Sequence, residues 1–288
     1  MVMRKCIYAW CFFLLISIPV YADSPVWKVS KGEHYIYLAG TVHLLGKADY
    51  PLPSTFEQAY YDSEKLVFET DIQEFQTPAF QKIFMEKLTF PEGKTIQNVI
   101  SKNTFAALKK HLSDRGVPVE QLIKFKPGML TMVLSVLEMQ RLKIADAGVD
   151  DFYLQKGIKD HKKLGYLESV NEQLSFIIDM DKGNPDELIM YTLRDISQIE
   201  EQMAVIKQAW RKGDNDKLRD MALIPWKKNF PELYNNLLVN RNNKWIPQIE
   251  AMLSTTEVEF VLFGALHMVG DDGVLEQLNT RGYHIQKL

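Results

Sequence analysis

One short pattern of residues occurs near both ends of the chain. GTVHLLG covers residues 40–46 and GALHMVG covers residues 264–270, and both read Gly-x-x-His followed by two apolar residues and Gly. The chain has only six histidines, so these matching contexts single out His43 and His267. A neutral imidazole ligates divalent metals, and it also carries protons near neutral pH. The repeated pattern therefore predicts two halves of one chemical site.

Both histidines follow a run of residues that is typical of a strand. HYIYLAG precedes His43 and EVEFVLFG precedes His267, and both runs are rich in β-branched and aromatic residues. Two further apolar runs, KLVF and LGYL, lead into Glu69 and Glu168. In open α/β sheets, ligands bind beyond the carboxyl ends of the strands. Parallel, adjacent strands would therefore bring two imidazoles and two carboxylates together.

The glycine that starts each heptapeptide has a predicted structural role at this site. Gly40 and Gly264 have no Cβ, so we expect each to let the chain turn sharply off its strand. The two apolar residues after each histidine would then anchor the following loop and hold the imidazole in place.

Two imidazoles and a carboxylate suit a divalent cation. The predicted ligands are His43, His267 and Glu69, because imidazole favours zinc, iron or nickel and carboxylate admits manganese or magnesium. Three protein ligands leave an open position for water. Glu69 or Glu168 would then act as the general base that takes the proton from that water. Replacing either histidine with alanine should abolish metal binding and leave the fold nearly intact.

Each of these residues also has an ordinary interpretation. A single Gly-x-x-His is a weak signal, since a histidine at a strand end is usually a buried or capping residue. Glu69 or Glu168, taken alone, is consistent with a surface charge. The matched pair favours function, because a pocket with convergent polar groups is the default candidate site. Asp150, in GVDD, is interpreted as a helix N-cap rather than a ligand.

Several common catalytic signatures are absent from the sequence. It contains no H-E-x-x-H, no G-x-S-x-G, no Walker A loop and no G-x-G-x-x-G. A classical zinc peptidase, an α/β-hydrolase and a nucleotide enzyme are therefore disfavoured.

Apolar, strand-like segments lie near both ends of the chain and enclose a mainly helical middle. Because each terminal strand is too apolar to stand alone, we expect them to meet in one sheet. The predicted fold is α/β, with a central mixed, largely parallel sheet flanked by helices. The middle section, about 101–253, would be a mainly helical insertion that forms a cap on a single domain covering residues 23–288. Within it, one long helical stretch is expected from Asp186 to Gly213, and a helix interrupted near Pro247. Ser54, with Glu57 three residues on, is expected to cap an earlier helix.

Residues 1–22 have the layout of a secretory signal peptide. Arg4 and Lys5 precede an apolar run, and Val20-Tyr21-Ala22 supplies a small-residue cleavage site. An uncleaved anchor is the alternative, although the run is short for a span of about 20 residues. Both cysteines, Cys6 and Cys11, lie in this segment, so the mature chain would have no disulfide. We therefore predict a secreted or periplasmic protein with no membrane span after cleavage.

The charge of the chain argues against a nucleic-acid partner. Its formal net charge is −3, and no basic stripe interleaved with aromatic residues appears.

The sequence resembles the TraB/GumN family, which includes the Tiki proteins and is related more distantly to erythromycin esterases and ChaN-like proteins. The resemblance starts with Trp27-Lys28-Val29 and the YLAGTVHLLG block, and it continues through LVFETD, KPGML, GVDDFYL and LGYLESVNEQL. It closes with AWRKGD, NRNNKW and FVLFGALHMVGDDGVLEQLNTRGYHIQKL. Any single block is unspecific, but the two Gly-x-x-His blocks in this order are specific.

The resemblance implies the fold and activity of a metal-dependent hydrolase, because Tiki proteins look like membrane-anchored metalloproteases that use manganese or cobalt. It implies that His43 and His267 are the paired histidines and that Glu69 is the acid after the second strand block. It also places Arg241 and Asn242 near the site, where they would bind substrate. This chain departs from Tiki in having no anchor beyond the leader, which puts a membrane-tethered substrate in doubt.

The guanidinium of Arg241 makes chemical sense there, because it can bind a substrate carboxylate or stabilise an oxyanion. A surface arginine beside a helix-capping Asn242 is the alternative.

Two functions remain open. The first is a divalent-metal-dependent hydrolase, with a peptidase favoured, that uses manganese, cobalt or zinc on a peptide or small-molecule substrate. The second is a non-catalytic protein on the same scaffold that binds haem, a peptide signal or an envelope component.

Overall fold

A computed structural model describes residues 24–144 and 146–288. The leader predicted for residues 1–22 lies outside this range. A six-stranded sheet in the order β6-β4-β7-β2-β1-β8 forms the centre, and β3 pairs with β5 in a small second sheet. The strands are β1 (Val26–Lys31), β2 (His34–Thr41), β3 (Leu44–Leu45), β4 (Lys65–Phe68), β5 (Asp146–Ala147), β6 (Lys163–Tyr166), β7 (Glu259–Gly264) and β8 (His284–Lys287).

The sheet is mixed and largely parallel, as the sequence predicts. The neighbours β6, β4, β7 and β2 are parallel to one another, whereas β1 is antiparallel to both β2 and β8. Strands β1 and β2 form a hairpin, and Gly32 lies in its turn with φ 66°. The first and last strands of the described chain therefore belong to one sheet.

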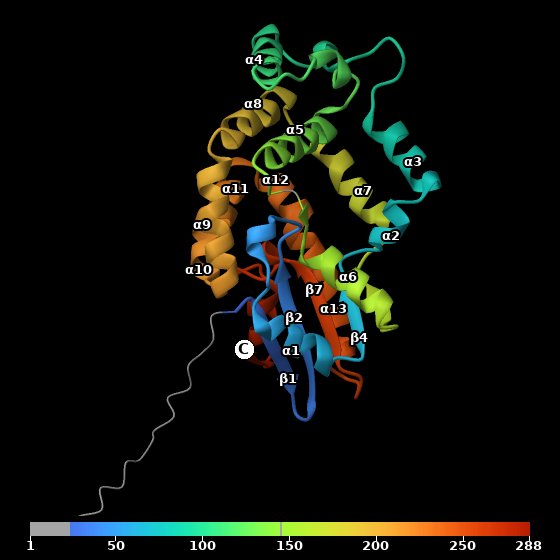
Figure 1. Cartoon of the computed structure of the whole chain (residues 1–288), viewed down its shortest axis with the longest axis vertical. Helices are drawn as coiled ribbons and strands as arrows, with labels where there is room; N and C mark the ends of the chain where they lie inside the picture. The colour runs from blue at the N-terminus through green and yellow to red at the C-terminus, as the bar shows by residue number, and fades with distance from the viewer. Residues whose placement is uncertain (1–23, 145) are drawn as a thin grey trace, which may run out of the picture.

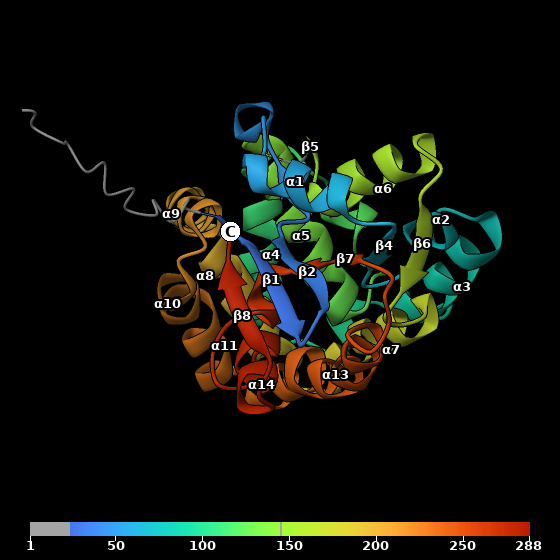
Figure 2. The ribbon, with the colours of Figure 1, turned by 90° about the horizontal axis from the view of Figure 1, so that it is seen from below.

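Helices surround this sheet and continue beyond one end of it. They are α1 (Ser54–Asp62), α2 (Ile72–Phe75), α3 (Pro78–Leu88), α4 (Lys102–Ser113), α5 (Pro127–Arg141), α6 (Val149–Lys159), α7 (Val170–Asp179), α8 (Pro185–Ile196), α9 (Ile199–Lys212), α10 (Asn215–Leu218), α11 (Ile224–Asn229), α12 (Pro231–Tyr234), α13 (Asn240–Met252) and α14 (Val274–Thr280). Figure 2 shows α1 and α6 over one face of the sheet and α13 and α14 over the other. Coverage of both faces explains why β7 is almost entirely apolar and buried.

The helices α4, α5 and α8 form a cap beyond the carboxyl ends of the parallel strands (Figure 1). They have their own apolar core, in which Leu108, Leu130 and Ile189 pack together apart from the core of the sheet. Within 101–253, however, β6 pairs with β4 and α6 packs on β4, so part of this segment belongs to the sheet layer.

Several local predictions were wrong. The N-cap of α1 is Pro53, with no side-chain cap, because the helix already includes Ser54. Asp150 is not an N-cap either, since Gly148 takes that position in α6. By contrast, the prediction that the stretch from Asp186 to Gly213 is helical is confirmed, because α8 and α9 cover it. In contrast to the predicted interruption, α13 continues through Pro247, and burial of its apolar side chains offsets the lost backbone bond.

None of the helices in residues 24–144 and 146–288 combines the length and the apolar character that crossing a bilayer requires.

Candidate functional site

The four strand ends singled out in the sequence meet at one edge of the sheet. Thr41 pairs with Gly264, while Phe68 pairs with both Leu262 and Tyr166. The chain remains paired for one more step, because the backbone N–H of Glu168 donates to the carbonyl oxygen of Glu69 at 2.9 Å. The parallel register therefore delivers both predicted carboxylates to the edge where both heptapeptides begin their loops.

Gly264 is the point on which three of the predicted side chains converge. A methyl group built on Gly264 would lie 3.2 Å from Glu69 Oε1, 3.6 Å from His43 Nε2 and 3.7 Å from His267 Cδ2. The backbone of Gly264 has φ −50°, so it needs no left-handed conformation. Its lack of a side chain provides space for the two imidazoles and the carboxylate. Gly40 likewise provides close packing, since a methyl group there would lie 3.1 Å from Ala265.

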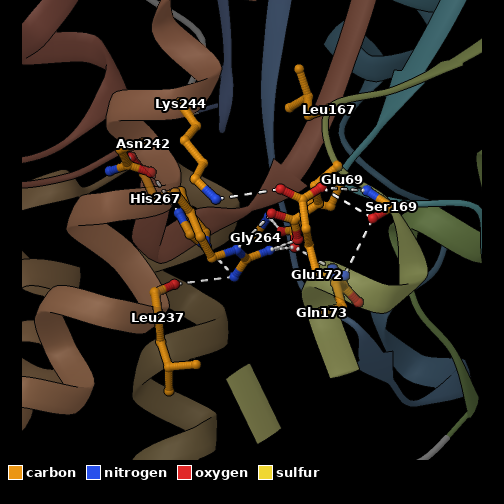
Figure 3. A network of polar contacts seen from close by, with 12 residues as sticks. Glu69, Leu167, Ser169, Glu172, Gln173, Leu237, Asn242, Lys244, Gly264 and His267 are labelled. Carbon is orange, nitrogen blue, oxygen red and sulfur yellow. Dashed lines mark hydrogen bonds and ion pairs between the residues drawn. The ribbon is translucent and has the colours of Figure 1, made fainter. Parts of the chain in front are cut away.

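Arg241 lies at the centre of a buried polar network, and protein atoms accept from all five of its N–H groups. Figure 3 labels its partners Glu69, Leu237 and His267. Nε and Nη2 bind Glu168 in a bidentate pair at 3.1 Å and 2.7 Å. Nη2 also binds Glu69, while Nη1 donates to the carbonyl oxygen of Leu237 at 3.1 Å and to His267 Nε2 at 3.0 Å. The surface position considered for Arg241 is therefore excluded, because this side chain is buried.

The two carboxylates that bind Arg241 have pKa values shifted in opposite directions. Burial alone would raise the pKa of Glu69, but Arg241, the neighbouring imidazoles and the Gly264 N–H, which donates at 2.6 Å, lower it to about 2. Burial raises the pKa of Glu168, and the bonds from Arg241 offset only part of this. Carboxylates whose pKa values are pushed apart are a common feature of acid–base sites.

His267 is buried and has a partner at each ring nitrogen. Nδ1 lies 2.6 Å from Asn242 Oδ1, and Asn242 donates through Nδ2 to the carbonyl oxygens of His267 and Asp272. Since Oδ1 can only accept, Nδ1 carries the proton and Nε2 accepts from Arg241. Burial, followed by the charge of Arg241, lowers the pKa of His267 to about 3, so the ring is neutral. Trp245 packs against the ring, with centroids 4.5 Å apart.

His43 has the opposite environment, because 60% of its side chain is exposed. Its Nδ1 lies 3.1 Å from Asp150 Oδ2, and the charge of that carboxylate raises the pKa of His43. The first turn of α6 supplies Asp150, and α6 docks closely there: a methyl group on Gly148 would lie 2.3 Å from the carbonyl oxygen of His43. The second ring nitrogen, Nε2, faces Gly264 and Glu69.

A cavity of about 350 Å³ lies beside His43 and Glu69. Three buried oxygens belonging to residues that line it have no hydrogen-bond partner within the part of the chain that the structure describes: Thr41 Oγ1, Thr70 Oγ1 and Asp150 Oδ1. Buried polar atoms are normally satisfied, so three such oxygens on residues that line one cavity are unusual.

The side chains at the site do not, in this arrangement, fit a resident metal. Among residues 24–144 and 146–288, no group of three or more His, Cys, Asp or Glu side chains is placed to hold a metal ion. The reason is visible in the bonds, because Arg241 occupies His267 Nε2 and one oxygen of Glu69. Gly264 bonds to the other Glu69 oxygen. The predicted ligands His43, His267 and Glu69 are thus brought together around a guanidinium.

Sequence reasoning missed two contributions to the site. The sequence favours a helix cap for Asp150, whereas the structure places it in the first turn of α6, beside His43. An acidic residue at the start of the helix in GVDD is the sequence feature that could have indicated this contact. Gln173 donates to Glu69 Oε2 at 3.2 Å from α7, and no sequence signal marks it.

The family model described as TraB/PrgY/gumN family matches residues 25–287, which confirms the resemblance seen in the motifs. Uncharacterized protein YbaP of Escherichia coli K12 is 22% identical over 278 residues, covering 90% of this chain and 98% of its own length. Metalloprotease TIKI2 of Danio rerio is 22% identical over 325 residues, covering 92% of this chain and 61% of its own. Metalloprotease TIKI1 of Danio rerio is 21% identical over 314 residues, covering 92% and 63% respectively.

This chain therefore spans less than two thirds of these metalloproteases. No solved structure gives a significant match.

Proposed function

The chain belongs to the TraB/PrgY/gumN family, and from that premise we propose that it is a hydrolase that cleaves peptide bonds in the cavity beside His43. Distant relatives that carry the name metalloprotease support the reaction class. The side chains that line the cavity support this location for the reaction. They include an imidazole, a carboxylate and three residues with an unpartnered oxygen among the described residues.

The observation that carries the proposal is the pairing of His43 with Asp150 at the wall of this cavity. Asp150 Oδ2 accepts from Nδ1, which leaves Nε2 as the nitrogen that takes a proton. A carboxylate that orients an imidazole in this way is the base arrangement of many hydrolases.

Asp150 raises the pKa of His43 to about 9, so the form with a free Nε2 predominates only above that pH. In the proposed reaction, this neutral form takes a proton through Nε2 while the oxygen of a water molecule attacks the carbonyl carbon of the peptide. The carbon–nitrogen bond then breaks, and the same proton passes from His43 to the departing amine. Asp150 holds the tautomer of the ring throughout. Glu69, ionised and fixed by Gly264 and Arg241, stabilises the positive charge that develops on His43.

Arg241, Glu168 and Asn242 have positioning roles in this proposal. The N–H groups of Arg241 are all engaged within the protein, so its function is to fix Glu69 and Glu168. Asn242 fixes the ring of His267. Arg241 and Asn242 could therefore make the predicted contacts with substrate only by breaking these hydrogen bonds within the protein.

The experiment also tests the divalent ion predicted from the sequence, because the donor atoms of His43, His267 and Glu69 do not fit a metal ion in this arrangement. Manganese, cobalt and zinc are each added to the assay, and a parallel sample contains a chelator. A secreted or periplasmic location also stays part of the proposal.

The test is a peptide-library digest read by mass spectrometry, with purified wild-type protein and the His43→Ala variant. We expect cleavage by the wild type and its loss in His43→Ala. His284→Ala is the matched control, since His284 lies exposed on β8 and outside the cavity. Cleavage by His43→Ala at the wild-type rate would contradict the proposal. Binding of a peptide without any cleavage, under all metal conditions, would favour the non-catalytic alternative.

A further inference from the structure

A side chain of the protein lies where the sequence predicts a metal ion. Of the three expected ligands, Glu69 and His267 bond instead to the guanidinium of Arg241. The third, His43, bonds through Nδ1 to Asp150. A divalent ion binds nitrogen and oxygen donors at about 2.0–2.2 Å. An ion and the guanidinium therefore cannot use the donors of Glu69 and His267 at the same time.

The acceptors around Arg241 form a site that suits a cation. Glu168 binds Nε and Nη2 through its two oxygens, Nη2 also binds Glu69, and Nη1 bonds to His267 Nε2. The side chains of Arg241, Glu69 and Glu168 are each 10% exposed or less, so a charge of either sign requires a partner there. Carboxylates and imidazole are also donors that zinc and manganese accept. The same three side chains therefore have the chemistry to hold either a guanidinium or a divalent ion.

Further contacts hold the guanidinium in this position. Its central carbon lies 4.8 Å from the centre of the Trp245 ring and 5.2 Å from the centre of the Phe176 ring. At such distances a cation is attracted to the face of an aromatic ring. The carbonyl oxygen of Leu237, four residues before Arg241, accepts from Nη1 at 3.1 Å. Because α7, α13 and the strand ends all supply partners, displacing the guanidinium would break contacts with several elements at once.

We infer that the guanidinium of Arg241 fills the position of the divalent cation at this site and excludes such an ion while it is in place. Removing it would leave His267 Nε2 and the oxygens of Glu69 and Glu168 around one vacated volume, which then becomes a metal site. The inference concerns the cation alone and does not depend on the proposed hydrolysis, since its test measures metal binding and not cleavage.

The test titrates zinc, and separately manganese, into the full chain by calorimetry after a chelator has removed any metal. Arg241→Ala should bind one ion per chain about tenfold or more tightly than the wild type, because the ion replaces the missing charge beside two buried carboxyl groups. Arg219→Ala is the matched control, since Arg219 forms exposed ion pairs, and it should bind the ions like the wild type. Adding His267→Ala to Arg241→Ala should remove the gain, because it takes away one of the three donors.

A second comparison does not require Arg241→Ala to fold. Wild type and His267→Ala are titrated with the same ions, and both should bind them equally weakly, because Arg241 already occupies His267 Nε2 in the wild type. Circular dichroism shows whether Arg241→Ala is folded, and if it is not, this comparison decides alone.

Three results would overturn the inference. The first is tight binding of an ion by the wild type that His267→Ala abolishes. The second is a folded Arg241→Ala that binds zinc and manganese no better than the wild type. The third is a gain in Arg241→Ala that persists when His267→Ala is added, because the ion would then lie elsewhere.

Discussion

The two Gly-x-x-His segments have the same sequence pattern and opposite environments. His43 is 60% exposed, is paired with Asp150 on one side and has its second nitrogen toward the cavity. His267 is 7% exposed and has both nitrogens engaged, by Asn242 and Arg241. The pKa of His43 is raised, whereas that of His267 is lowered to about 3. A shared pattern thus fixes where an imidazole lies along the chain, while its partners fix what it can do.

His43→Ala should mainly reduce activity, whereas His267→Ala should mainly reduce stability. Of the variants considered, His43→Ala should have the largest effect on activity. It removes the proposed base, so peptide hydrolysis should fall about 10²–10⁴-fold. Stability should change little, because the side chain is mostly exposed. The measurements are kcat/KM on a cleaved library peptide and a urea unfolding curve. A large loss of stability in this variant would erase the contrast with His267.

Arg241→Met should have the largest effect on stability. It leaves Glu69 and Glu168 buried without their cation, and breaking a buried pair in this way costs about 3–5 kcal/mol of unfolding free energy. Arg219→Met is the control, because Arg219 forms solvent-exposed ion pairs, and such pairs contribute little to stability. Adding Glu168→Gln to Arg241→Met should recover part of the loss. No recovery would show that buried charge is not the cause.

His267→Ala should destabilise the protein by about 1–3 kcal/mol, since it leaves buried groups of Asn242 and Arg241 without a partner. This revises the sequence-based expectation that both histidine variants leave the fold nearly intact. The unfolding free energy from urea titration tests it, and His284→Ala provides an exposed histidine for comparison. Equal stability of His43→Ala and His267→Ala would break the distinction between the two segments.

The smallest expected effect concerns Glu259, at the start of β7. This side chain is buried, and its Oε2 has no hydrogen-bond partner among residues 24–144 and 146–288. Burial raises the pKa of Glu259 to about 7, and the charge of Lys65 offsets only part of this. Its usual value is 4.5, so between about pH 4.5 and 7 the unfolded chain loses a proton that the folded chain keeps. This group therefore makes stability fall as pH rises through that window.

Glu259→Gln should flatten that fall and raise stability at pH 8 relative to the wild type. Urea unfolding midpoints at pH 5 and pH 8 measure the difference. Glu257→Gln is the control, because Lys163 lowers the pKa of Glu257 and its carboxylate is not penalised at high pH. If the difference between the unfolding midpoints at pH 5 and pH 8 is the same in Glu259→Gln as in the wild type, other groups cause the fall of stability with pH.

The sequence by itself determined the strand ends, the α/β class and the family. Local patterns suffice for this, because alternation, apolar runs and glycine positions report burial and chain direction over a few residues. They placed His43, Glu69, Glu168 and His267 at one edge of a parallel sheet, where the structure finds them.

Only the tertiary structure decided the charge states and partners at that edge. Arg241 comes from a helix far along the chain and satisfies two carboxylates and one imidazole, while Asp150 reaches His43 from the start of α6. Hydrogen bonds and charge interactions act through space, and burial depends on every element packed around a group. For that reason two heptapeptides that share one sequence pattern present one exposed proton carrier and one buried, neutral ring.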